Sequence, residues 1–338
     1  MSTALLTGGT GYIGSHTAVS LLESGYDVVV VDNLVNSQID SIKAVEKLCN
    51  RKVPTYIGDV RDAELMNRIF EENKIDVVIH FAGLKAVGES VYKPLEYYDN
   101  NLSSTITLIR TMLAHDVTRL VFSSSATVYD PADEPERVEG MPLGNCTCPY
   151  GWTKFVIEQI IRDCCHAYPQ LSAISLRYFN PVGAHPSGVI GENPLGIPNN
   201  LMPYIQQVAV GKLDHLNIFG KDYDTPDGTC IRDYIHVCDL ANAHTAACDY
   251  LMEHHCCEEI NVGNGKGVSV LELVQAFEKA NNMKLPYVFA DRRAGDQPIM
   301  FANADKAHRL LNWHSEKSVE DMCRDAYRYQ QNATKGQE

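Results

Sequence analysis

Residues 7–14 read TGGTGYIG and join a short apolar run to a helical pattern. Glycines at three-residue spacing allow a tight turn and let the backbone approach a pyrophosphate closely. The helix expected to follow runs to about Ser24, with Gly25 placed to end it, and points its free N–H groups and positive dipole end at that anion. The stretch therefore predicts the strand–loop–helix unit that opens a dinucleotide-binding fold.

A carboxylate follows at the expected distance. The second apolar run, Val28–Val31, ends at Asp32, 18 positions after Gly14. Such a residue accepts hydrogen bonds from the adenosine ribose hydroxyls and repels a 2′-phosphate, so we predict NAD rather than NADP as the cofactor. The alternative, a glycine-containing turn and an aspartate that merely ends a strand, does not account for both features at this spacing.

Short apolar runs and helical patterns alternate up to about residue 180. This alternation predicts an α/β fold with a doubly wound parallel sheet of the Rossmann type. The expected strands are Ala4–Leu6, Val28–Val31, Thr55–Ile57, Val77–Phe81, Leu120–Ser123 and Ala173–Leu176. Helices are expected at Ala63–Glu72, Tyr97–Leu113 and Tyr150–Ala167. Ligands of such sheets bind at the carboxyl ends of the strands.

The character of the sequence changes after residue 180. Pro181–Pro203 is rich in Pro, Gly and Asn, which indicates an extended binding loop. A smaller mixed α/β region follows, with strands expected at Leu216–Phe219 and Tyr287–Phe289, and helices at Asp239–Met252, Val270–Ala280 and Ser318–Gln331. We predict an NAD-binding domain over residues 1–180 and a substrate-binding domain over 181–338, with part of 230–265 packing back on the first.

Composition excludes several classes of partner. The 338 residues carry a formal net charge of −14, which opposes binding to nucleic acid or to an anionic membrane surface. We expect neither a secretory signal nor a membrane span. The eleven cysteines show no paired spacing for zinc, and adjacent ligands such as those of residues 254–257 rarely share one ion, so we predict no metal and a reducing, cytoplasmic location.

The candidate chemical centre is the pair Tyr150 and Lys154, one helical turn apart. A tyrosine beside a lysine can act as an acid–base group on a sugar or alcohol hydroxyl. Lowering a tyrosine pKa from about 10 towards 7 needs roughly 4 kcal/mol. A cation about 6 Å away supplies roughly 3 kcal/mol at an effective dielectric of about 20. We therefore expect Lys154 and the positive charge of NAD⁺ to lower the pKa of Tyr150 together. Ser125 could hydrogen-bond the reacting oxygen.

These motifs resemble the extended short-chain dehydrogenase/reductase family, and within it the UDP-galactose 4-epimerases. The resemblance extends over nearly the full length and is carried by residues 8–16, 80–90, 94–100, 123–129, 177–188, 198–203, 232–236 and 292–296. It implies an NAD-dependent interconversion of UDP-galactose and UDP-glucose: the C4 hydride moves to NAD⁺, the 4-keto hexose turns while UDP stays bound, and the hydride returns to the other face. The family is commonly dimeric, so we expect a homodimer.

The resemblance also implies roles for individual residues. Tyr150 would be the base, Lys154 its electrostatic partner and a ribose ligand, and Ser125 the residue that orients the hydroxyl. The predicted NAD contacts are Gly8, Gly11, Tyr12, Ile13, Gly14, Asp32, Asn33, Asn36, Ser37, Asp59, Val60, Phe81, Ala82, Gly83, Lys85, Asn100, Ser123, Tyr150, Lys154, Tyr178 and Phe179. The predicted UDP-sugar contacts are Ser125, Tyr150, Phe179, Asn180, Asn200, Leu201, Asn217, Phe219, Arg232, Arg293, Asp296 and Met300.

Two arginines can grip a diphosphate at two points, although Arg232 and Arg293 could instead form surface ion pairs with Asp233 and Asp296. Met300 stands where the family varies between a large tyrosine and smaller residues that accompany N-acetylated sugars. Because Met is bulky but flexible, we predict weak activity on such sugars. Asp130 replaces the usual glycine of the family, which puts the conformation of the following loop in question.

Two other functions fit parts of this pattern. A nucleotide-sugar 4,6-dehydratase shares the glycine loop and the Tyr–Lys pair, but that family carries adjacent Asp and Glu where this chain has Ala126 and Thr127. A non-catalytic NAD sensor would not need Ser125, Tyr150 and Lys154 together. Both are disfavoured.

Overall fold

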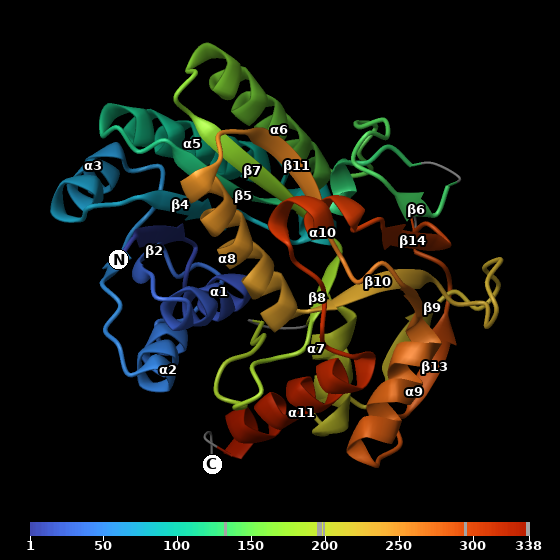
Figure 1. Ribbon diagram of the computed structural model, residues 1–338. Coiled ribbons are helices and arrows are strands. Elements are labelled where there is room, and N and C mark those ends of the chain that lie inside the picture. Colours follow the sequence, from blue (N-terminus) through green and yellow to red (C-terminus); the bar gives the residue numbers. More distant parts are fainter. Residues whose placement is uncertain (132–133, 195–197, 199, 294–295, 336–338) are drawn as a thin grey trace.

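A parallel sheet of seven strands forms the main layer of the molecule (Figure 1). The computed structural model describes residues 1–131, 134–194, 198, 200–293 and 296–335. Within them the strand order is β11-β7-β5-β4-β1-β2-β3. The strands are β1 (Thr3–Thr7), β2 (Asp27–Asp32), β3 (Thr55–Ile57), β4 (Val77–His80), β5 (Arg119–Ser125), β7 (Ser172–Tyr178) and β11 (Cys257–Val262). The predicted α/β class and doubly wound sheet are confirmed.

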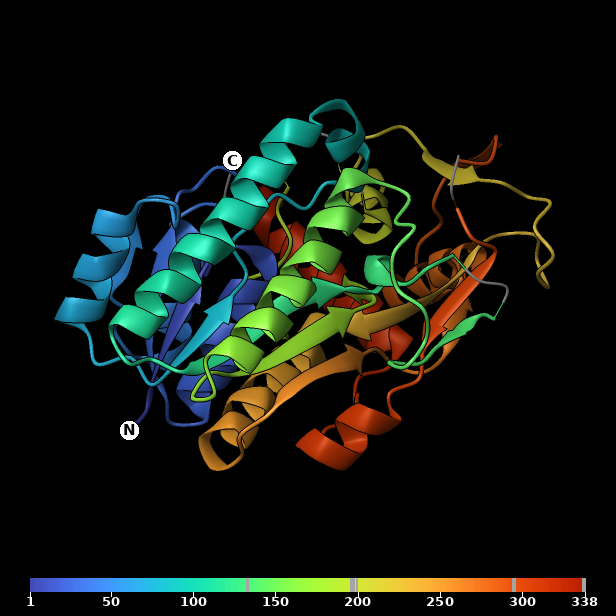
Figure 2. The same ribbon diagram turned by 90° about the horizontal axis from the view of Figure 1, so that it is seen from above.

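Helices cover both faces of this sheet, which explains why its strands are continuously apolar. Successive strand residues enter opposite cores: Leu6 and Ile79 belong to one buried cluster, and Leu5 and Val78 to the other. Figure 2 shows the long helices α5 and α6 lying over one face, with α1 and α8 on the opposite side. The helices of this region are α1 (Tyr12–Glu23), α2 (Asp40–Cys49), α3 (Ala63–Glu72), α4 (Val87–Tyr92), α5 (Pro94–Ala114), α6 (Pro149–Ala167), α8 (Val237–Glu253) and α10 (Asp305–Leu311).

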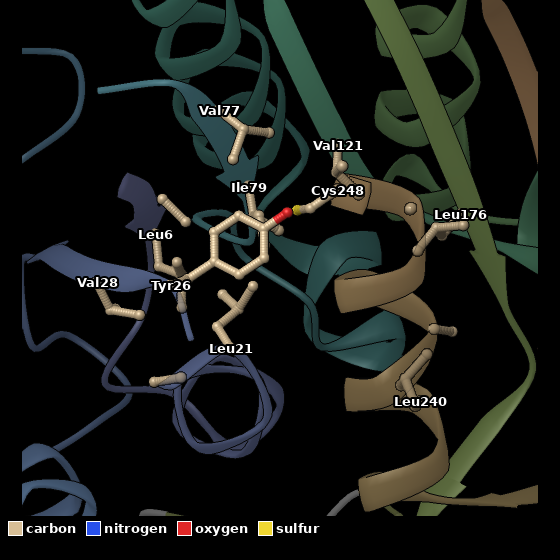
Figure 3. Close-up of a cluster of buried hydrophobic side chains, with 14 of the residues drawn as sticks. Leu6, Leu21, Tyr26, Val28, Val77, Ile79, Val121, Leu176, Leu240 and Cys248 are labelled. Atoms are coloured by element: carbon tan, nitrogen blue, oxygen red, sulfur yellow. The ribbon is translucent and has the colours of Figure 1, made fainter. Parts of the chain in front are cut away.

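The second half of the chain contributes to this first layer. Figure 3 shows Tyr26 among Leu6, Leu21 and Ile79, with its hydroxyl end directed towards Cys248 of α8. That hydroxyl also donates to Asp249 (2.7 Å). Strand β11 pairs in parallel with β7 along its whole length, from Cys257 to Val262. Residues beyond 230 thus complete both the sheet and its helical cover, and the division into domains at residue 180 stays a prediction.

A smaller region lies beside the carboxyl ends of the main strands (Figure 1). Its larger sheet has the order β12-β10-β14-β6, with β8 also paired to β10, and a second sheet joins β9 and β13. Its strands are β6 (Glu136–Arg137), β8 (Asn180–Val182), β9 (Leu216–Phe219), β10 (Ile231–His236), β12 (Gly267–Ser269), β13 (Tyr287–Ala290) and β14 (Ile299–Ala302), and its helices are α7 (Leu201–Ala209), α9 (Val270–Asn281) and α11 (Val319–Lys335). A short 3-10 helix, η1 (Ala126–Val128), follows β5.

Several elements were not predicted from the sequence, and polarity explains two of the strands among them. Strand β10 reads IRDYIH and β11 reads CEEINV, so neither gives a continuous apolar run. Both are nevertheless buried at their carboxyl halves, where β11 covers the edge of β7. Helices α2 and α7 were also missed. The predicted strands and helices are otherwise present, with ends that differ by a few residues.

Candidate active site

The backbone of the glycine loop packs against the backbone of the loop after β4. The two loops meet between β1 and β4, where the strand order of the sheet reverses. A Cβ atom on Gly14 would lie 2.6 Å from the carbonyl oxygen of Gly8, and one on Gly8 would lie 2.7 Å from the amide nitrogen of Ala82. The loops that follow β1 and β4 therefore touch, and α1 begins directly after them at Tyr12. This position is where doubly wound sheets bind nucleotides, and the close approach suits a pyrophosphate above the start of α1.

Asp32 is fixed at the end of β2 and faces this loop. It is 7% exposed and accepts hydrogen bonds from the backbone N–H groups of Thr10 (3.1 Å) and Leu34 (2.9 Å) and from the hydroxyl of Ser37 (3.0 Å). The carboxylate is thereby held beside the turn that would carry the pyrophosphate. The donor set and the glycine contacts together fit a dinucleotide whose ribose lies at Asp32.

The neighbouring strand end carries a second carboxylate. Asn33 donates to Asp59 (3.2 Å), and the Arg61 guanidinium holds the pKa of that carboxyl below its usual range. Arg61 also contacts Asp99 of α5 (2.7 Å), next to the predicted contact Asn100. Thus Asn33 and Asp59 lie together, whereas Asn36 is an exposed residue of the following loop.

Ser125, Tyr150 and Lys154 are brought together by β5 and α6. Lys154 is buried, donates through Nζ to the carbonyl oxygen of Ser123 (2.6 Å) and lies 5.8 Å from the centre of the Tyr150 ring. Ser125 ends β5, and its hydroxyl is hydrogen-bonded to the Tyr150 phenol. The three predicted catalytic side chains therefore share one location above the end of β5.

The pKa of Tyr150 departs from the expected direction. Burial raises it to about 12, while the hydrogen bond with Ser125 lowers it. Burial also lowers the pKa of Lys154 to about 7, against the raising effect of Glu158. In the cofactor-free protein, desolvation of both groups therefore outweighs the effect of Lys154 on the Tyr150 pKa, and the lowering expected from Lys154 and bound NAD⁺ together stays a prediction.

Residues 178–180 connect the two regions. The Tyr178 hydroxyl is hydrogen-bonded to His244 of α8, and burial raises the pKa of Tyr178 while a bond to Ser123 lowers it. Phe179 is buried in a cluster that Met300 packs against. Asn180 begins β8 and pairs with Tyr234 of β10. Met300 is therefore close to Phe179, at the junction beyond the catalytic residues.

The two predicted arginines share one carboxylate. Arg232 contacts Asp296 (3.4 Å) and donates to the carbonyl oxygen of Gln297 (2.7 Å), and Arg293 donates to Asp296 (2.9 Å). Arg293 also lies over the Phe219 ring, 5.1 Å from its centre. Asp233 instead accepts from backbone N–H groups and forms no ion pair with Arg232 among the described contacts. Asp296 thus places two guanidinium groups side by side, as a diphosphate site requires.

Sequence reasoning missed several polar residues that join these parts. Glu192 contacts Lys85 (3.5 Å) and accepts from Asn200 (3.2 Å), so it connects the loop after β4 to the start of α7 and Leu201. Asn101, rather than its predicted neighbour Asn100, is buried and binds the backbone of Leu84 and the hydroxyl of Thr153. Only their position beside predicted residues could have pointed to them.

The remaining predicted residues have these places. The two touching loops contain or adjoin Gly11, Ile13, Ala82 and Gly83. Val60 follows β3, and Asn217 is on β9. Phe81 follows β4 and packs against His244, with the two rings tilted. Tyr12 donates to the carbonyl oxygen of Gly183 (2.7 Å), which ties α1 to the strand end of β8. Asp130 accepts from Asn145 (2.9 Å).

The described residues hold no group of three or more His, Cys, Asp or Glu side chains arranged for a metal ion. None of the helices described is both long and apolar enough to cross a membrane. All eleven cysteines are free thiols.

Comparison with known proteins gives consistent matches over the whole chain. A family model described as GDP-mannose 4,6 dehydratase matches residues 5–326. UDP-glucose 4-epimerase uge1 of Schizosaccharomyces pombe is 54% identical over 334 residues, 97% of this chain and 94% of that protein. UDP-glucose 4-epimerase of Bacillus subtilis is 52% identical over 332 residues, 98% of each chain. The crystal structure of UDP-glucose 4-epimerase from Bifidobacterium longum in complex with NAD⁺ and UDP matches with a TM-score of 0.95 at 50% identity, covering 99% of this chain and 100% of that one.

Proposed function

This chain belongs to the family of the UDP-glucose 4-epimerases, and from that premise we propose that it interconverts UDP-galactose and UDP-glucose with NAD as a resident cofactor. The observation that carries the proposal is the joint placement of Ser125, Tyr150 and Lys154 beside the glycine loop, with Arg232 and Arg293 in the adjoining region. An acid–base group, a dinucleotide site and a diphosphate site are the parts that this reaction needs.

Bound NAD supplies hydride acceptance and return at C4 of the hexose. The residues of the chain perform the rest: Tyr150 takes the proton of the 4-hydroxyl and later gives it back, and Ser125 orients that hydroxyl. Lys154, anchored on the Ser123 carbonyl, supplies positive charge next to the phenol. Arg232 and Arg293 hold the diphosphate while the 4-keto hexose turns, so either face of C4 can be presented for hydride transfer while the C4 oxygen exchanges its proton with Tyr150.

The test is to incubate the purified protein with UDP-galactose, without added cofactor, and to quantify UDP-glucose. We expect conversion towards a fixed mixture with no net accumulation of NADH. Recovery only after NAD⁺ is added would mean that the cofactor had been lost during purification. No conversion with NAD bound would contradict the proposal for this pair of sugars.

The description of the matching family model names a dehydratase, and the residues that separate the two reactions favour the epimerase. Elimination across C5–C6 needs a further acid and base. Ala126 and Thr127, at the start of η1, supply neither carboxylate. A 4-keto-6-deoxy product in the assay above would reverse this assignment.

The protein is proposed to act as a homodimer in the cytoplasm. Helix α4 and the start of α5 expose Val91, Tyr92 (87%) and Leu95 (79%), an apolar surface suited to a protein contact. Eleven free thiols are typical of a reducing compartment. Analytical ultracentrifugation of the parent and of Leu95→Glu tests the assembly, and we expect a dimer and a monomer, respectively.

A further inference from the structure

A buried polar network lies directly behind the catalytic residues, centred on Glu158 and Arg177. Arg177 donates to Glu158 at two points, through Nε (2.9 Å) and Nη2 (2.7 Å), and Ser124 donates to the same carboxylate (2.6 Å). Glu158, Arg177 and Ser124 are each only 1% exposed. The proposed reaction assigns no step to any of them.

The network extends towards the loop after β5. The third nitrogen of Arg177 donates to the Tyr129 hydroxyl (3.1 Å), which in turn donates to Asn261 of β11 (2.6 Å). The Arg177 guanidinium also lies over the Tyr129 ring, 4.9 Å from its centre. Glu158 has a second arginine, Arg162, at 3.7 Å. The carboxylate is therefore fully engaged, and its position is fixed by α6, β5 and β7 together.

Each member of the network lies next to a residue of the candidate active site. Ser124 precedes Ser125 at the end of β5, and Arg177 precedes Tyr178 at the end of β7. Glu158 lies one helical turn after Lys154 on α6, and its carboxylate accepts from Ser124 of β5 and Arg177 of β7. A single carboxylate thus holds in register the two strand ends and the helix that carry the proposed chemistry.

The same carboxylate carries the negative charge nearest to Lys154 on α6. The other titratable groups around this lysine are Tyr150 on α6 and His80 on β4; Tyr178 on β7, Tyr97 on α5 and Cys148 interact with Tyr150. Burial lowers the pKa of His80 to about 3, so His80 is neutral at pH 7. Glu158 is the group whose charge raises the pKa of Lys154.

We propose that Glu158 is a positioning residue of the active site: it aligns Ser125 and Tyr178 through Ser124 and Arg177, and it favours the charged form of Lys154 one turn away. The inference rests on the proposed function, because Lys154 and Ser125 define what is positioned. The rival explanation is that the Glu158–Arg177 pair only stabilises the fold.

The test compares Glu158→Gln with Arg177→Lys. The first removes the carboxylate charge, and the second keeps both charges but loses the two-point contact. A purely structural role predicts that both variants lower the melting temperature and kcat alike, without moving any titration. A positioning role predicts that only Glu158→Gln shifts the titration of Lys154.

Two measurements report the titration of Lys154. The first is kcat against pH for the NAD-loaded enzyme: activity falls as Lys154 loses its proton, so we expect this alkaline limb to lie about one pH unit lower in Glu158→Gln and to stay in place in Arg177→Lys. The second is NMR titration of ¹³C-labelled lysine, with the Lys154 signal assigned by its loss in Lys154→Arg. We expect a midpoint about one pH unit lower in Glu158→Gln.

Failure of folding has its own control. If Glu158→Gln does not fold, the double variant Glu158→Gln/Arg177→Met removes the pair without leaving an unpaired buried charge, and we expect it to fold with a Lys154 midpoint below that of the parent. An unchanged Lys154 midpoint in the folded variants would overturn the inference. If the parent does not convert UDP-galactose, the proposed function fails, and the NMR titration still decides whether Glu158 controls the charge of Lys154.

Discussion

The two binding regions of this molecule are built by different means. The cofactor region is made of backbone: the loops after β1 and β4 touch at Gly8 and Ala82, and Asp32 is 7% exposed and held by three hydrogen bonds. The substrate region depends on long side chains, since the Arg293 side chain is 55% exposed and is held by Asp296. The first region is thus formed before any ligand binds. In the second region, Arg232 and Arg293 can exchange their contact with Asp296 for a contact with a diphosphate.

Catalysis requires both properties. A cofactor that stays bound needs a fixed site, and a hexose that turns needs a site that holds it only through its nucleotide. The proposed role of Tyr150, as the group that exchanges a proton with the hexose while NAD is bound, involves both regions. Substitutions in the cofactor region should therefore weaken NAD binding, and substitutions in the substrate region should weaken UDP binding.

The largest expected effect is at the residue that the two regions share. Tyr150→Phe removes the acid–base group, so kcat should fall by about 10³-fold. Phe keeps the ring, and we expect NAD content and melting temperature to be nearly unchanged. Rates of UDP-glucose formation and the cofactor released on denaturation measure this. Activity within a factor of about ten of the parent would mean that another group moves the proton.

In the backbone-built region, Gly14→Ala should weaken NAD retention by about 10–100-fold, because the added Cβ would lie 2.6 Å from the Gly8 carbonyl oxygen and must displace the loop. The matched control is Gly140→Ala, where a Cβ meets nothing within 4 Å. NAD content after gel filtration compares the two. Equal retention would mean that the loop can relax and that its backbone contacts do not set the affinity.

In the region built from side chains, Arg232→Met should raise the Kd for UDP by about 10–100-fold, since a charge-assisted contact is lost. NAD retention should not change. Asp296→Asn provides the contrast: it frees both arginines from their carboxylate, so UDP binding should be preserved or tightened. Titration calorimetry with UDP distinguishes these outcomes, and a parallel loss of NAD in Arg232→Met would contradict the separation of the two regions.

The buried Lys154 should lower the free energy of unfolding of the protein. Its pKa is lowered from 10.5 to about 7, so between these values the unfolded chain holds a proton that the folded chain lacks, and stability rises with pH. Lys154→Met should therefore increase the free energy of unfolding by roughly 2–4 kcal/mol at pH 7. The advantage should shrink towards pH 10. Urea unfolding of cofactor-free protein at both pH values tests the sign.

The smallest effect is expected at Met300, which packs beside Phe179. Met300→Cys should increase turnover of UDP-N-acetylglucosamine relative to UDP-glucose by about tenfold, and Met300→Tyr should decrease it. The ratio of kcat/KM for the two sugars is the measurement. Equal turnover of both sugars by the parent would show that Met300 already admits the N-acetyl group.

Much of the site could be predicted because its residues follow strand ends in a regular order. The glycine loop, Asp32 and the Tyr150–Lys154 spacing are local patterns, and the strand alternation places their ends on one edge of the sheet. Glu192 and Asn101 could not be predicted, because their partners lie in other loops and no local period marks them. The raised pKa of Tyr150 in the cofactor-free protein could not be predicted either, since desolvation depends on what covers the phenol.

The amino-acid sequence by itself determined the doubly wound sheet, the cofactor class and the catalytic pair, because each follows from spacing along a short segment. Only the tertiary structure decided that β11, within the stretch expected to pack back on the first domain, pairs with β7, that Asp296 sets two arginines side by side, and that Glu158 and Arg177 meet behind the catalytic turn. The contacts of β11 with β7 and of Arg232 with Asp296 join segments far apart in the chain, and the Glu158–Arg177 pair joins a helix to the next strand. Burial, which gives them their strength and sets the pKa values, exists only once these segments have packed together.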